Sequence, residues 1–341
     1  MDISWIIATV VCFTSVLLLR PIAVSWGLVD RPDNRKRHVG DIPLIGGLAI
    51  YLSTLTSVSL YIDSSQHINL ILVSISLVVF IGALDDKYDL SAKLRLIAQV
   101  LIASVLTFGT GIHIHSFGNI IGIGEITTGP LSGVVTVLAI IAGINAFNMT
   151  DGIDGLAGAL SLVSLLAISL IINDTDIQIL IGVMSSALIV FLLFNLGLFR
   201  KKYKIFMGDA GSMMLGLVVS WLLIVASQSQ QASIAMAPAN VLWFIAVPVI
   251  DMIAVMYRRV RKGQSPLVAD REHLHHVFME IGLKPRQALL FITTISICFA
   301  LFGIFMTSYE LPGFVTLSFF ITVFIIYNKM LSIRHKFVLK K

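Results

Sequence analysis

The chain has 341 residues, of which 57% are hydrophobic and 13% are charged, and its formal net charge is +5. Soluble domains are about 25% charged, so this composition excludes an ordinary soluble protein and indicates an integral membrane protein with repeated apolar runs of about 20 residues. The two cysteines, Cys12 and Cys298, each lie in an apolar run, which excludes a disulfide framework and a cysteine-based metal site.

Apolar segments follow one another along the whole chain and predict an all-α polytopic membrane protein with about eleven transmembrane helices. The first segment has no Lys or Arg before it, so we interpret it as a retained helix and not as a cleaved signal peptide. We expect a single integral membrane domain over residues 1–341. The predicted segments are 3–25, 44–61, 68–84, 94–110, 131–147, 156–172, 177–196, 210–227, 240–257, 288–307 and 311–328.

The connecting loops alternate in charge. All 24 Lys and Arg residues lie in, or at the adjoining segment ends of, one alternate set of loops. The other set has no Lys or Arg and carries five acids. The positive-inside rule then places the N-terminus outside and the C-terminus in the cytoplasm. This one-sided positive field suits an anionic lipid surface and argues against a nucleic-acid partner. The cation-bearing loops are 26–43, 85–93, 148–155, 197–209, 258–287 and the tail from Asn328.

The first cation-bearing loop contains two features. Pro43, Gly46 and Gly47 predict a turn where two backbones approach closely. A basic cluster suits phosphate or lipid headgroups, or serves only as an orientation signal. It consists of Arg35, Lys36, Arg37 and His38.

Asp85 and Asp86 end the third segment. Adjacent side chains point about 100° apart on a helix, so the two acids have different tasks. We expect one to face a site and the other to be held by a cation such as Lys87 or Lys93. The alternative is a solvated helix end with two capping acids.

Residues 145–158 read NAFNMTDGIDGLAG and place Asn148, Asp151 and Asp154 at intervals of three. If this stretch is helical, the three side chains share one face. A carboxylate beside apolar segments raises the free energy of the folded protein unless it binds a cationic group. The glycines, Gly152 among them, leave that flank open, or they mark a close helix contact.

Residues 205–216 read IFMGDAGSMMLG. Glycine-rich backbone around Asp209 at a helix start suits phosphate oxygens on the amides and a divalent ion on the carboxylate. The alternative is an ordinary N-cap. Phe206 is either an interfacial aromatic or a stacking surface for a base.

The loop 258–287 is the longest on the predicted cytoplasmic side, and we expect it to contribute to the active site. It contains His273, His275 and His276 after Arg271. A zinc site would need a matching second half, so a phosphate clamp fits better, and three interfacial histidines are the alternative.

Asp251 lies deeper, inside a predicted span, where an acid is a functional candidate by default. Pairing with Arg258 or Arg259 is the structural alternative, and the sequence leaves both open.

Acids and cations interleaved at one membrane face suit a magnesium-bound polyphosphate, because phosphoryl transfer needs mainly positioning and charge neutralisation. A lipid phosphate fits as second substrate. A transporter is the rival, but it would place polar residues near the span centres.

Four motifs occur in the order found in the polyprenyl-phosphate N-acetylhexosamine-1-phosphate transferase family, which this chain resembles from Arg31 to about His276. They are the Asp85-Asp86 pair, NAFNMTDGIDGLAG, FMGDAGS and HLHH. The segments ADREHLHH and DRPDNRKRHVGDIPLIGG are most similar to those of one branch of this family. That branch makes undecaprenyl-pyrophosphoryl-GlcNAc from UDP-GlcNAc and undecaprenyl phosphate. The branch that takes UDP-MurNAc-pentapeptide usually has three consecutive histidines instead of HLHH.

The resemblance implies a role for each matching residue. Asp209 would bind the metal with Asn148 close by, and Asp85 and Asp86 stand where the family's proposed base or nucleophile stands. Asp151 would support the metal or the diphosphate. The remaining implied contacts are Asp154 with uracil, Phe206 and Gly152 with the nucleotide, and Lys93, Arg271, His273, His275 and His276 with the phosphate region.

The expected reaction is attack of the lipid phosphate on the β-phosphorus of UDP-GlcNAc with release of UMP, supported by Mg²⁺ or Mn²⁺. It runs directly, or through a covalent aspartyl intermediate. The resemblance implies a bacterial inner-membrane enzyme with a cytoplasmic active site, surrounded by membrane lipids, that begins O-antigen or enterobacterial common antigen type synthesis. Another UDP-HexNAc or UDP-MurNAc-pentapeptide is the alternative donor. The oligomeric state stays open, with a homodimer as one option.

Overall fold

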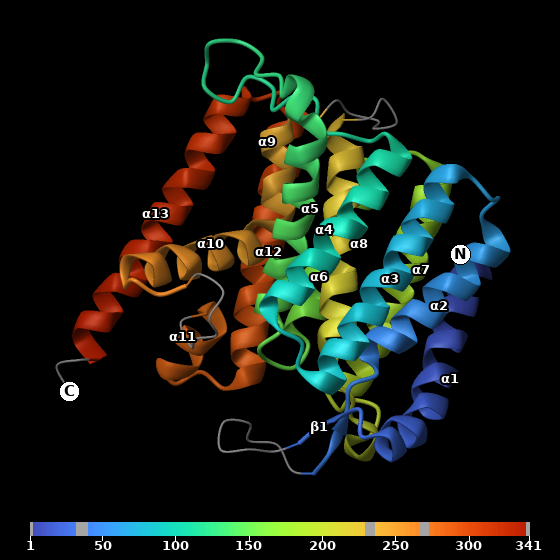
Figure 1. Cartoon of the computed structure of the whole chain (residues 1–341). Coiled ribbons are helices and arrows are strands. Elements are labelled where there is room, and N and C mark those ends of the chain that lie inside the picture. The colour runs from blue at the N-terminus through green and yellow to red at the C-terminus, as the bar shows by residue number, and fades with distance from the viewer. Residues whose placement is uncertain (1–2, 32–39, 229–235, 266–272, 339–341) are drawn as a thin grey trace.

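The computed structural model describes residues 3–31, 40–228, 236–265 and 273–338. Long helices run side by side, and α10 lies across them (Figure 1). The helices are α1 (Ile3–Trp26), α2 (Gly46–Tyr61), α3 (Gln66–Tyr88), α4 (Ala92–Thr110), α5 (Ser132–Thr150), α6 (Leu156–Ser169), α7 (Thr175–Asn195), α8 (Gly208–Gln228), α9 (Pro238–Val241), α10 (Ala246–Arg261), α11 (Leu274–Glu280), α12 (Pro285–Ser308) and α13 (Gly313–Val338). Three 3-10 turns, η1 (Gly129–Leu131), η2 (Lys201–Tyr203) and η3 (Leu242–Ile245), interrupt the connections.

The predicted all-α membrane class is confirmed. Within the described residues, 9 helical segments are long and apolar enough to cross a membrane. The predicted segments 44–61 and 156–172 form shorter helices, α2 with 16 residues and α6 with 14. The bundle therefore matches the predicted segment order, with two members shorter than an ordinary span.

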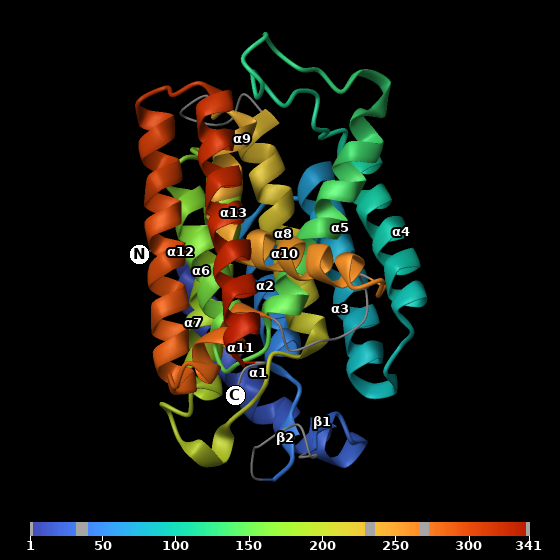
Figure 2. The same cartoon turned by 90° about the vertical axis from the view of Figure 1, so that its left-hand side faces the viewer.

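The predicted segment 240–257 is not one straight helix. It divides into α9, η3 and α10, and Figures 1 and 2 show α10 turned across the bundle. Pro248 explains the break, because a proline has no N–H and its ring clashes with the carbonyl of the residue four positions earlier. That residue is Phe244, and its carbonyl accepts a hydrogen bond from Ser164 Oγ at 2.7 Å.

The core of the bundle is α8. Every residue from Ala210 to Ala226 is buried, which is the pattern of a helix surrounded by other helices. It packs tightly against α5, where a Cβ on Gly216 would lie 2.6 Å from the Cα of Ile144. This close packing holds the start of α8 beside the end of α5, which is where the polar motifs lie.

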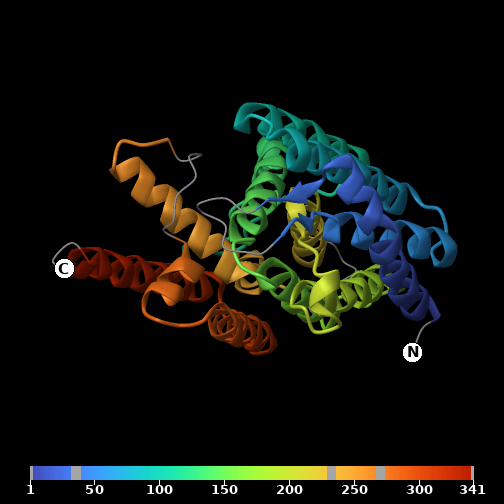
Figure 3. The same ribbon diagram turned by 90° about the horizontal axis from the view of Figure 1, so that it is seen from below.

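One end of the bundle gathers the connections that carry these motifs. The short strands β1 (Val29–Asp30) and β2 (Ile42–Pro43) pair there, and the view from below shows this end, with α10 and α13 extending to one side (Figure 3). The predicted close approach is confirmed, because Gly46 N donates to Phe206 O at 2.9 Å and a Cβ on Gly47 would lie 2.2 Å from Gly211 N. The loop 111–130 lies at the opposite end (Figure 2).

Candidate active site

Asp86 caps the start of α8. Its Oδ1 accepts from Asp209 N at 2.7 Å, and its Oδ2 accepts from Ala210 N at 3.2 Å. Gly208 begins the helix at φ +73, and a Cβ there would lie 2.5 Å from Asp86 Oδ2. The ordinary N-cap alternative for Asp209 is therefore wrong, because the cap comes from α3 and Asp209 is inside the first turn.

Asp85 is held by a cation that the sequence reasoning did not choose. Arg95 Nη1 donates to Asp85 Oδ2 at 2.9 Å, and Leu90 N donates to Oδ1 at 2.8 Å. The side chain of Asp85 is only 2% exposed. Lys87 and Lys93 were the expected partners, and this expectation is wrong, because the first turns of α4 carry Arg95 inward while Lys93 is exposed.

Asp209 meets Asn148 across the bundle. Asn148 Nδ2 donates to Asp209 Oδ1 at 2.7 Å and lies 3.1 Å from Ser212 Oγ. Arg95 lies between the two acids, because its Nη1 is 2.9 Å from Asp85 Oδ2 and 3.9 Å from Asp209 Oδ2. Two acids, one amide and one guanidinium thus converge from α3, α4, α5 and α8.

The stretch around Asp151 is not helical, so the predicted single polar face is wrong. Helix α5 ends at Thr150, and Gly155 has a φ of +79 that an α-helix does not allow. Asp151 and Asp154 consequently have separate surroundings. Burial, followed by the nearby charges of Asp209 and Asp154, raises the pKa of Asp151 to about 7.

Gly152 makes room for a histidine. A Cβ at this position would lie 2.1 Å from Cε1 of His275. The imidazole of His275 is buried, and this burial, with the charges of His276 and His273, lowers its pKa to about 3. The histidine is therefore neutral near pH 7, which fits a hydrogen-bonding role better than a cationic one.

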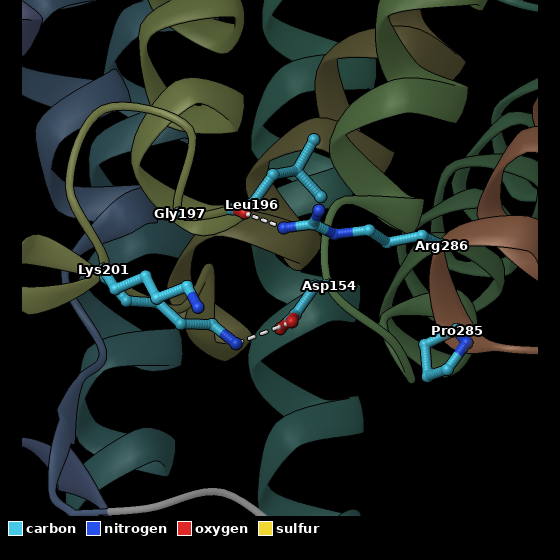
Figure 4. Close-up of a pocket in the computed structure, with 7 residues that line it drawn as sticks. Asp154, Leu196, Gly197, Lys201, Pro285 and Arg286 are labelled. Carbon is cyan, nitrogen blue, oxygen red and sulfur yellow. Dashed lines mark hydrogen bonds and ion pairs between the residues drawn. The ribbon is translucent and has the colours of Figure 1, made fainter.

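Asp154 faces a small pocket of about 220 Å³ between the α7–α8 connection and α12 (Figure 4). Lys204 Nζ lies 2.6 Å from Asp154 Oδ2 and 5.1 Å from the ring centroid of Phe206. Arg286 crosses the pocket and donates to the carbonyl of Leu196 at 3.0 Å. Asp154 and Phe206 are the two residues that we expect to contact the nucleotide base. Both lie against the ammonium group of Lys204.

The histidines line a larger groove of about 540 Å³ that is bordered by α4, α5 and α10. Its polar end carries Arg95, Asn148, His273, His275 and His276, and the remaining lining combines apolar side chains with Gln99, Asn145 and Arg259. The apolar lining includes Leu96, Leu138, Ile141, Met252 and Met256. A molecule with a charged head and an apolar body suits this lining.

Asp251 contacts the histidine segment instead of standing alone in the span. Its carboxylate bonds His273, Leu274 N and the hydroxyl of Tyr327. Arg271 and the basic cluster of the first loop lie outside the described residues.

Sequence reasoning did not single out Arg95, Lys204 or Tyr327. Arg95 had one available signal, because it is a cation near the start of an apolar segment. Lys204 is one of several lysines in its loop, and Tyr327 is one of several aromatic residues in α13, so neither had a distinguishing pattern.

The comparisons with known proteins agree with the motif order. Residues 68–227 match the family model described as glycosyl transferase family 4. The undecaprenyl-phosphate alpha-N-acetylglucosaminyl 1-phosphate transferase of Salmonella typhi is 40% identical over 92% of this chain and 86% of that protein. The proteins of the same name from Escherichia coli (strain K12) and Haemophilus influenzae are 40% and 41% identical, over 96% and 95% of this chain and 90% and 91% of theirs. The chain therefore belongs to the polyprenyl-phosphate N-acetylhexosamine-1-phosphate transferase family.

Proposed function

We propose that this protein transfers GlcNAc-1-phosphate from UDP-GlcNAc to undecaprenyl phosphate, giving undecaprenyl-pyrophosphoryl-GlcNAc and UMP. The observation that carries the proposal is that Arg95, which binds Asp85, and Asn148, which binds Asp209, both line a groove with largely apolar walls. The relatives are named for a transferase with this acceptor and this sugar phosphate. The proposed site is the cytoplasmic face of a bacterial inner membrane, at the first lipid-linked step of O-antigen or enterobacterial common antigen type synthesis.

The donor set suits Mg²⁺, with Mn²⁺ as an alternative. No three His, Cys, Asp or Glu side chains form a ready metal cage in the described part of the chain. Mg²⁺ does not require one, because it usually takes one or two carboxylates and completes its shell with water and substrate phosphates. Asp209 and Asn148 would hold the ion, and Asp85 adjoins them. When bound, the ion would neutralise the diphosphate and stabilise the leaving UMP.

The pair of Asp154 and Lys204 supports uracil as the base. A carboxylate and an ammonium 2.6 Å apart present an acceptor beside a donor, which complements the N3–H and the neighbouring carbonyl of uracil. Cytosine presents a lone pair at N3 and an amino donor at C4, so it would oppose both groups. Phe206, which lies under the same ammonium, supplies an aromatic face for stacking.

The groove between α4, α5 and α10 supports a polyprenyl phosphate as acceptor. Its apolar walls can take the first isoprene units, and His273 and Arg95 can contact the phosphate at its polar end. The lipid phosphate oxygen attacks the β-phosphorus, the bond from that phosphorus to the UMP oxygen breaks, and the sugar–phosphate bond stays intact.

The contacts of the two adjacent acids favour the direct route over a covalent intermediate. Both oxygens of Asp86 accept backbone N–H groups of α8, and both oxygens of Asp85 are bonded to Arg95 and Leu90. A nucleophilic aspartate would have to give up such bonds. A phosphate monoester, with a second pKa near ~6, is already largely dianionic at neutral pH and needs little activation.

The test uses purified protein with UDP-GlcNAc, undecaprenyl phosphate and Mg²⁺, and measures UMP release and the lipid product. UDP-GalNAc and UDP-MurNAc-pentapeptide serve as competing donors. We expect UDP-GlcNAc to give the highest kcat/KM, and absence of UMP release with every donor would overturn the proposal.

One variant tests the metal assignment, and one exchange experiment tests the direct route. Asp209→Ala should abolish Mg²⁺-dependent turnover, and Asp63→Ala, in the connection between α2 and α3, is the matched control for loss of a carboxylate. Exchange of labelled UMP into UDP-GlcNAc without lipid would refute the direct route.

A further inference from the structure

A buried network connects the last helix of the bundle to the histidine segment. Asp251, on α10, is 3% exposed, and His273, just before α11, is 7% exposed. His273 Nδ1 lies 2.9 Å from Asp251 Oδ2. Asp251 Oδ1 accepts from Leu274 N at 3.0 Å and from the hydroxyl of Tyr327, on α13, at 2.6 Å.

The donors in this network determine which ring nitrogen of His273 is protonated. Leu274 N and the Tyr327 hydroxyl both occupy Oδ1, so Oδ2 remains for the imidazole. An ionised carboxylate only accepts hydrogen bonds, and His273 must therefore donate from Nδ1. This leaves Nε2 as the nitrogen available to a ligand, and His273 lines the groove.

The three histidines are not equivalent. The rings of His273 and His275 lie parallel, with an interplanar angle of 5° and centroids 5.8 Å apart. Within the described residues, only His273 of these two histidines binds a carboxylate. The buried His275 is neutral near pH 7. A carboxylate that accepts from one ring nitrogen fixes the tautomer and the orientation of the imidazole.

We infer that Asp251, supported by Tyr327, is the positioning residue of His273 and fixes the Nδ1-protonated imidazole so that Nε2 meets the phosphate of the acceptor lipid. His273 is the group that touches substrate, and Asp251 acts only through it. The chain after residue 227, which lies beyond the matched family model, would then supply a complete functional unit from α10, α11 and α13.

The substitution Asp251→Asn has a specific consequence in this geometry. The amide oxygen would keep the bonds to Leu274 N and Tyr327, so the amide NH₂ would face His273 Nδ1. Two donors cannot face each other, and the proton of the neutral imidazole would move to Nε2. The ring would stay in place with the wrong nitrogen protonated, which is the established effect of the same exchange in a serine-protease triad.

The first measurement does not depend on turnover. In detergent-solubilised protein labelled with ¹⁵N-histidine, the resonances of His273 are identified by their loss in His273→Ala. We expect the neutral ring to carry its proton on Nδ1 in the wild type and on Nε2 in Asp251→Asn. An unchanged tautomer in Asp251→Asn would overturn the inference, whatever reaction the enzyme catalyses.

The second measurement is a double-mutant cycle on UMP release, and it rests on the proposed function. Asp251→Asn should lower kcat by about tenfold to a hundredfold, the usual size of such effects behind a histidine. Added to His273→Ala, it should have almost no further effect, because residues that act as a unit are not additive. If the effects of the two substitutions on kcat multiply in the double variant, Asp251 acts elsewhere than through His273. If the wild type releases no UMP, the proposed function is refuted, but the result on the His273 tautomer still stands.

Tyr327→Phe separates positioning from general packing. It removes one bond to Asp251 and should reduce kcat less than Asp251→Asn, with a similar KM. The matched control is Tyr51→Phe, which deletes a 3.0 Å bond from Tyr51 to Ser76 between α2 and α3. Equal loss of activity in both tyrosine variants would assign Tyr327 to helix packing and refute its part in the network.

Discussion

Asp151 makes the folded protein sensitive to pH. Its pKa rises from the ordinary value of 3.8 to about 7, chiefly because the carboxyl is buried and then because Asp209 and Asp154 lie near. A carboxyl whose pKa is raised on folding contributes stability below its unfolded pKa, and this contribution is lost as the pH rises through the folded pKa. The relevant window therefore extends from about pH 4 to about pH 7.

The substitution Asp151→Asn removes this titration. A rise of about three pKa units corresponds to about 4 kcal/mol, and partial solvent exposure of Asp151 reduces the effect, so we expect on the order of 2 kcal/mol. Relative to wild type, the variant should gain stability between pH 4 and pH 7, with no further gain above about pH 8.

The assay is thermal unfolding in detergent with EDTA, which keeps the protein free of divalent metal. Wild type, Asp151→Asn and the control Asp63→Asn are compared at several pH values. A constant difference between wild type and Asp151→Asn from pH 4 to pH 8 would refute the reasoning, because it would show that the two states bind the same number of protons at Asp151.

Three further substitutions probe the end of the bundle that carries the site. Arg95→Met leaves buried Asp85 without its cation, and a lost hydrogen bond to a charged group predicts destabilisation of about 2 kcal/mol; an unchanged unfolding midpoint in denaturant would argue against this pair. Asp86→Ala removes the cap of α8 and should cost about 1–2 kcal/mol of unfolding free energy together with most of the UMP release, whereas full activity would contradict the capping role. Gly152→Ala puts a methyl group on the His275 ring and should reduce turnover with little change in UMP affinity; weaker UMP binding, measured by calorimetry, would instead support the nucleotide role predicted for Gly152.

The different surroundings of Asp151 and Asp154 follow from the local backbone. Asp151 and Asp154 lie three residues apart, yet one is near Asp209 and the other binds Lys204. Helix α5 ends between Asn148 and Asp151, so the short loop can direct the two acids apart. A continuous helix would have kept them on one face.

The sequence by itself determined the membrane class, the order of the helices and the end of the bundle where chemistry is expected. These features depend on segment length, on the placement of charge and on local motifs, all of which are readable without tertiary contacts. The pairing of Asn148 with Asp209 also follows from the motif order once the family resemblance is recognised.

Only the tertiary structure decided how each polar group is satisfied. Asp86 caps a helix 123 residues away in sequence, Asp85 binds Arg95 in place of a nearby lysine, and Asp251 joins His273 to Tyr327. Such partners depend on how α3, α8, α10 and α13 pack and on where Pro248 turns the chain. A buried acid must find a donor or a cation, but composition and spacing do not specify which one lies within reach.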